Sequence, residues 1–187
     1  MKLRRLGSRT AAFVLLAALA LPAFASDWTA DPAASKLAFV AEYSEGPIDG
    51  RFNRFAPSIR FDPADLASAR FDVEIDLASV STGDEEWDGY LVGEEFFNVE
   101  GFPKAHYRAE RFEARDGGFV ALGTLELRGV QQPVELSFTF ETSGDGATLK
   151  GSAQLDRIAF GVGGGDWEDP DTIAHGVKVE TELKLSR

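Results

Sequence analysis

The stretch from Gly123 to Phe140, GTLELRGVQQPVELSFTF, predicts two β-strands folded against each other across a short turn. We expect the turn over Arg128 to Gln132, with Gly129 permitting the reversal and Pro133 placed where no ladder hydrogen bond is made. The apolar residues of the second strand alternate with polar ones and so share one face: Val134, Leu136, Phe138 and Phe140. A hairpin cannot bury these side chains alone, so the chain must supply further strands with one apolar face each.

Strand-like alternation recurs along the rest of the chain. It is clearest in three segments, residues 37–43, 71–77 and 177–185. Weaker candidates cover residues 50–61, 105–112, 119–127 and 148–157, most of them separated by turn residues. Together with the hairpin they give about eight antiparallel strands, which close most simply into a barrel or a two-layer sandwich. An eight-stranded barrel is either filled by its own side chains or wide enough for one slim ligand.

One segment, residues 83–98, lacks the period of two. Trp87, Tyr90 and Leu91 have helical spacing, and the first turn is acidic, which suits a helix N-terminus. We expect a short helical insertion here, capped by Thr82, that covers a barrel mouth or a sheet edge.

The N-terminus predicts a signal peptide. A basic head is followed by an apolar run over residues 11–20 and by small residues around Ala23 and Ala25. Cleavage after Ala25 would leave one mature domain, residues 26–187, in the periplasm, by either the general or the twin-arginine route.

Charge and cysteine content exclude several function classes. Without the first 25 residues, 15 basic residues face 31 acidic ones, a formal net charge of −16. Such acidity opposes binding to nucleic acid or to an anionic membrane surface. The chain has no cysteine, which rules out disulfides and thiolate chemistry.

Residues that suggest catalysis or metal binding are sparse. His106 and His175 are far apart in the sequence, and the glycine-rich stretch 161–165 lacks the lysine of a phosphate loop, so a turn is the better interpretation. The acidic clusters at residues 84–88 and 166–171 follow no known ligand spacing and are expected to be solvated. The prediction is therefore of a protein that is not an enzyme, with no catalytic residues and no metal.

Arginines near apolar segments leave two alternatives open. An arginine at the mouth of an apolar cavity can hold a phosphate, whereas the same residue can also serve a structural ion pair. The candidates are Arg51, Arg54, Arg128 and Arg157.

Five ordered motifs resemble the YceI-like, polyisoprenoid-binding family across almost all of the mature chain. They are Trp28 to Phe39, Gly50 to Pro63, Phe71 to Thr82, Leu91 to Pro103 with its paired aromatics and Phe-Pro, and the hairpin from Gly123 to Leu136, followed by a late Arg157 to Gly161. The sequence departs from the family where many members have a His-Ser pair, because Ala34-Ser35 stands there.

The resemblance implies an all-β fold, an extended, lipocalin-like eight-stranded antiparallel barrel whose apolar interior holds a polyisoprenoid or an isoprenoid quinone. The predicted lining residues are Phe39, Phe52, Phe71, Val73, Ile75, Phe96, Phe97, Phe138 and Phe140. The alternative is a non-catalytic interaction module with a filled barrel, accessory to a membrane redox protein such as a b561-type cytochrome. No cofactor is expected beyond a bound lipid or quinone, and a homo-oligomer stays open.

Overall fold

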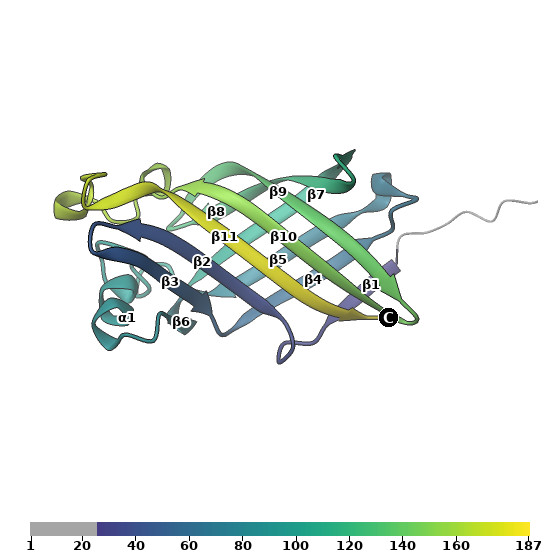
Figure 1. Ribbon diagram of the computed structural model, residues 1–187, viewed down its shortest axis with the longest axis horizontal. Coiled ribbons are helices and arrows are strands. Elements are labelled where there is room, and N and C mark those ends of the chain that lie inside the picture. Colours follow the sequence, from purple (N-terminus) through teal and green to yellow (C-terminus); the bar gives the residue numbers. More distant parts are fainter. Residues whose placement is uncertain (1–25) are drawn as a thin grey trace, which may run out of the picture.

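The strands form one antiparallel sheet that closes on itself where β1 (Ser26–Ala30) pairs with β11 (Ile173–Ser186). The computed structural model describes residues 26–187, so the predicted signal peptide lies outside the described residues. The barrel is elongated, with the helix α1 at one end and the C-terminus at the other (Figure 1). The remaining strands are β2 Lys36–Tyr43, β3 Gly46–Phe52, β4 Phe55–Phe61, β5 Arg70–Asp76, β6 Val80–Ser81, β7 Lys104–Arg115, β8 Gly118–Leu127, β9 Val130–Ser143 and β10 Gly146–Asp156.

The eleven labelled segments make a barrel wall of eight strands. Three of these wall strands are each divided into two labelled segments. β1 and β2 both pair with β11, and the next strand along the wall is likewise divided into β3 and β4. The third is divided into β5, which pairs with β4, and β6, which pairs with β3. The neighbours then follow in chain order from β7 to β11. The predicted eight-stranded antiparallel barrel is therefore confirmed, and the sandwich alternative is wrong.

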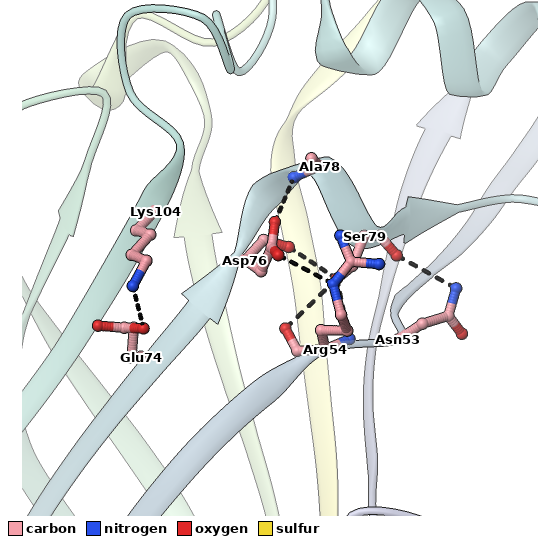
Figure 2. Close-up of polar contacts among 7 residues, drawn as sticks. All are labelled: Asn53, Arg54, Glu74, Asp76, Ala78, Ser79 and Lys104. Carbon is pink, nitrogen blue, oxygen red and sulfur yellow. Dashed lines mark hydrogen bonds and ion pairs between the residues drawn. The ribbon is translucent and has the colours of Figure 1, made fainter.

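The second and third wall strands are interrupted at the same level by a hydrogen-bonded joint (Figure 2). The backbone N–H of Asn53 donates to the carbonyl of Ser79 at 3.0 Å, and the backbone N–H of Arg54 donates to the Ser79 hydroxyl oxygen at 2.9 Å. That hydroxyl donates in turn to the carbonyl of Asp76 at 2.7 Å, and the Arg54 guanidinium pairs with the Asp76 carboxylate at 2.9 Å. Because its polar groups are satisfied, the joint bends both strands without leaving buried donors unpaired.

The hairpin formed by β8 and β9 has a tighter turn than expected. Leu127 pairs with Val130, so the turn contains only Arg128 and Gly129, both with positive φ (54° and 73°). Positive φ at both central positions is the type I′ geometry that matches strand twist. Residues 130–132, expected in the turn, belong to β9 instead. Pairing between β9 and β10 stops at Ser137 and Ser152, so Pro133 lies where β9 lacks a β10 partner, as its missing N–H requires.

The predicted helix is present as α1 (Glu85–Val92), inside the insertion at residues 83–98. Its N-cap was predicted wrongly. The Asp84 carboxylate, and not Thr82, accepts from the backbone N–H groups of Glu86 and Trp87, while the Thr82 hydroxyl donates to Asp88. Asp84 is favoured because a carboxylate also interacts well with the helix dipole. Within residues 26–187, no helix is long and apolar enough to cross a membrane.

Two glycines in the wall leave room for aromatic rings on neighbouring strands. A Cβ on Gly123 would lie 2.5 Å from ring atoms of Tyr107, and one on Gly50 would lie 2.1 Å from the ring of Phe39. Tyr107 is held in place because its hydroxyl donates to the carbonyls of Ala121 and Val134. The Phe39 ring makes no hydrogen bond and lines the interior cavity described below.

Because the Tyr107 ring is held by hydrogen bonds and the Phe39 ring is not, an added methyl group should destabilise the fold more at Gly123 than at Gly50. Gly123→Ala should lower the free energy of unfolding by about 2 kcal/mol, because the fixed Tyr107 ring must be displaced. Gly50→Ala should cost less, since the Phe39 ring can shift into empty space. Urea denaturation of both variants checks the order, and an equal or larger loss for Gly50→Ala would contradict it.

Candidate ligand-binding cavity

The barrel contains an elongated apolar cavity of about 190 Å³. All eight wall strands contribute side chains to it, and so do α1 and the segments beside it. Val73, Ile75, Val177 and Val179 line this space, yet they are only half-buried, so their free surface faces the cavity. The interior is therefore not fully packed, unlike an ordinary close-packed core.

The end of the barrel opposite α1 is filled by a cluster of aromatic rings, the plug. Phe61 is completely buried, and its ring centroid lies 4.9–6.0 Å from those of Phe71, Phe112, Phe119, Phe138 and Phe140. The indole N–H of Trp28 donates to the Phe61 carbonyl at 2.9 Å. The contacts with Phe119 and Phe138 are edge-to-face and the other three are tilted, so the rings fill this end of the barrel.

The other end is covered by a cap made of α1, the turns that follow it and the loop before β11. Leu91, Phe96 and Phe97 are buried beneath this cap and line the cavity. Trp87 also lines it, and its ring lies 5.1 Å from Tyr43 and 5.8 Å from Trp167. The prediction that the helical insertion covers a barrel mouth agrees with this arrangement.

Among residues 26–187, Arg157 is the one charged side chain that lines the cavity, and it is 5% exposed. All five of its N–H groups have acceptors, and every acceptor is a backbone carbonyl of the loop before β11 or of the start of β11 itself: those of Val162, Gly163, Trp167, Ile173 and Ala174. Burial lowers the pKa of its guanidinium, with opposing effects from Asp156 and Glu168. Arg157 thus holds the cap loop. It forms no ion pair among the described residues, and all of its N–H groups are used within the protein.

The other candidate arginines are also engaged away from the cavity. The Arg128 guanidinium donates to the carbonyls of Glu95, Phe96 and Gly161, which ties the β8–β9 turn to the cap. Arg54 pairs with Asp76 at the strand joint, and Arg51 is exposed on β3.

The structure divides the nine predicted ligand-binding residues into two groups. Phe138 and Phe140 belong to the plug and do not line the cavity. The other seven line the cavity, and Phe71 among them also contacts the plug: Phe39, Phe52, Phe71, Val73, Ile75, Phe96 and Phe97. Contact of any of them with a ligand stays a prediction. Val134 and Leu136, on the same face of β9, line the cavity in place of the two phenylalanines.

Sequence reasoning missed the contributions of β10, β11 and the helix. Trp87 and Leu91 were recognised as a helical face but not as lining, and Leu155, Val177 and Val179 were assigned to strands alone. For the strand residues Leu155, Val177 and Val179, the alternation with a period of two was the available signal.

The remaining candidates for chemistry stay apart. His106 lies on the outer face of β7, with Nε2 4.0 Å from Glu74, and the His175 ring contacts the backbone carbonyl of Glu168. In the part of the chain that the structure describes, no group of three or more His, Cys, Asp or Glu residues could hold a metal ion. The stretch 161–165 is a turn, with positive φ at Gly161, Gly163 and Gly165.

Comparison with solved structures shows the same architecture. The crystal structure of BcnA from Burkholderia cenocepacia has a TM-score of 0.80 with 28% sequence identity, covering 83% of this chain and 98% of that one. The YCEI protein of Campylobacter jejuni gives 0.66 at 22% identity, over 75% and 85% of the two chains. A polyisoprenoid binding domain from Saccharophagus degradans, implicated in plant cell wall breakdown, gives 0.64 at 18%, over 88% and 99%.

The fold and the cavity define a small closed β-barrel with a cluster of aromatic rings at one end and an apolar cavity between that cluster and the cap. Residues 28–185 match the YceI-like domain, and the chain belongs to that family. A UPF0312 protein of Yersinia pestis (strain Pestoides F) is 37% identical over 87 residues, which are 46% of this chain and 45% of that relative. The chain thus matches about half the length of such curated relatives.

Proposed function

We propose that this protein is an exported, non-catalytic carrier that holds the tail of an isoprenoid lipid or isoprenoid quinone inside the barrel. The observation that carries the proposal is the long apolar cavity between the phenylalanine plug and the cap. The polyisoprenoid binding domain of Saccharophagus degradans, which shares the fold, supports an isoprenoid ligand.

The energetics of the cavity favour a long apolar chain. Burial of apolar ligand surface contributes about 25 cal/mol per Å² and needs no directional partner. The polar groups of the lining are already engaged, since Tyr107 and Arg157 donate to backbone carbonyls and the Thr181 hydroxyl donates to the carbonyl of Lys36. Affinity would therefore come from the length and fit of the tail.

A second candidate is a docking function toward a membrane redox protein such as a b561-type cytochrome. The formal net charge of −16 after signal removal favours it, because an acidic surface steers binding to a basic partner. It accounts less well for the hollow interior.

Organic extraction of the purified protein, followed by mass spectrometry, tests the carrier. We expect a co-purifying polyprenyl or quinone species, or uptake of one on incubation. Absence of both would contradict the carrier and leave the docking function. Export is tested by sequencing the N-terminus of the periplasmic protein, which should begin at Ser26.

A further inference from the structure

Two segments of the cap are strongly acidic. Residues 84–101 and 164–172 contain eleven carboxylates and no lysine, arginine or histidine. Ten of the eleven residues are exposed, and Asp88 is half-buried. They are Asp84, Glu85, Glu86, Asp88, Glu94, Glu95, Glu100, Asp166, Glu168, Asp169 and Asp171. A ligand whose tail lies in the cavity would place its head group near this ring of negative charge.

Arg157, the charged side chain among the described residues that lines the cavity, has no free donor, because all five of its N–H groups are used on carbonyls. Arg128 lies outside the cavity lining, and its Nη1 contacts three carbonyls of the cap and its neighbouring loop. A phosphate could recruit Arg157 only by displacing the carbonyls that hold the cap loop in place. The cost would include several buried acceptors left unpaired.

The first three N–H groups of the glycine-rich turn are not available to an anion. Successive backbone N–H groups can cradle an anion when they point together at open space. Here the N–H groups of Gly161, Val162 and Gly163 donate to the carbonyls of Ile158, Arg157 and Glu95. These three donors are therefore committed to hydrogen bonds within the protein.

From these observations we infer that the cavity selects apolar chains with an uncharged or cationic head group and rejects the same chains when they end in phosphate or pyrophosphate. The inference rests on the proposed carrier function and narrows its ligand class. The discrimination is electrostatic, because the tail contacts are the same for both kinds of lipid. It acts through the exposed carboxylates of the cap and through the absence of a free cationic partner inside.

Matched lipids test the inference. Binding of farnesol, farnesyl phosphate and farnesyl pyrophosphate, whose short tails suit the cavity, to the purified protein can be followed by tryptophan fluorescence, since Trp87 lines the cavity and Trp167 lies beside it. A phosphate ester carries close to two negative charges at neutral pH, so we expect binding at least about tenfold weaker than that of the alcohol. Raising the salt concentration should narrow the gap, because exposed charges are screened.

A pair of double variants separates local charge from net charge. Glu94→Gln with Glu168→Gln removes two cap carboxylates that make no side-chain hydrogen bond among the described residues. Glu141→Gln with Asp145→Asn makes the same charge change near the plug end. The first pair should strengthen phosphate binding several-fold without changing binding of the alcohol, and the second should leave both unchanged.

The binding results distinguish a failure of the proposed head-group selectivity from a failure of the carrier function. Phosphate or pyrophosphate binding as tight as that of the alcohol would overturn the inference while the carrier function stands. Equal effects of the two double variants would also overturn it, since the cap would then have no special role. Binding of none of the three lipids would overturn the carrier function and the inference with it.

Discussion

Replacing Arg157 by methionine is expected to lower the free energy of unfolding by about 3–5 kcal/mol, among the largest effects of any single substitution in this chain. The side chain is buried, and its five N–H groups hold five backbone carbonyls between Val162 and Ala174. Methionine fills a similar volume but leaves these acceptors without donors in a region from which water is excluded.

Arg157→Lys should recover little of the loss. An ammonium group has three donors on one nitrogen and cannot reach five carbonyls arranged around a planar guanidinium. Urea denaturation measures both variants. The control is Arg60→Gln, which removes an exposed ion pair with Asp27 and should cost far less, because solvent screens an exposed pair. A loss for Arg157→Met as small as that of the control would show that the cap loop does not depend on this residue.

Val179→Trp should abolish uptake of the apolar ligand, with a loss of unfolding free energy of no more than about 1–2 kcal/mol. Val179 lies on β11, faces the cavity and is only half-buried, so a larger side chain has empty space to enter. The indole would then occupy the volume that the ligand tail requires. Lipid uptake and urea denaturation, measured on the same preparation, separate the two effects.

The matched control is Lys178→Trp, on the same strand but on the outer face, where Lys178 is exposed and pairs with Glu180. It introduces the same side chain outside the barrel and should leave uptake unchanged. Unchanged uptake in Val179→Trp would mean that the ligand binds elsewhere.

Phe138 is an unsuitable position for such a test of ligand binding. The sequence pattern alone makes Phe138 a suitable probe of the lining, because it shares a face with Val134 and Leu136. In the structure Phe138 is buried against Phe61 and Phe71 in the plug. Phe138→Arg would therefore bury an unpaired charge and report on stability, and not on ligand binding.

The sequence by itself determined the antiparallel strands, their inward faces, the short helix and the family. These features follow from local patterns, since a period of two decides which side chains share a face and turn residues decide where strands end. The Gly123 to Phe140 hairpin shows the reach of such patterns: its alternation was right along the whole of β9, although the turn was shorter than expected.

Only the tertiary structure decided which parts of that apolar face surround empty space. Val134 and Phe138 have the same pattern, yet one lines the cavity and the other fills the plug, because their surroundings come from strands distant in the chain. The role of Arg157 was equally hidden, since its acceptors are backbone carbonyls, which every residue carries and no sequence pattern marks. Packing density and backbone acceptors are properties of the assembled barrel. For that reason the alternation predicted only an apolar face, and a ligand-holding interior was expected only from the family resemblance.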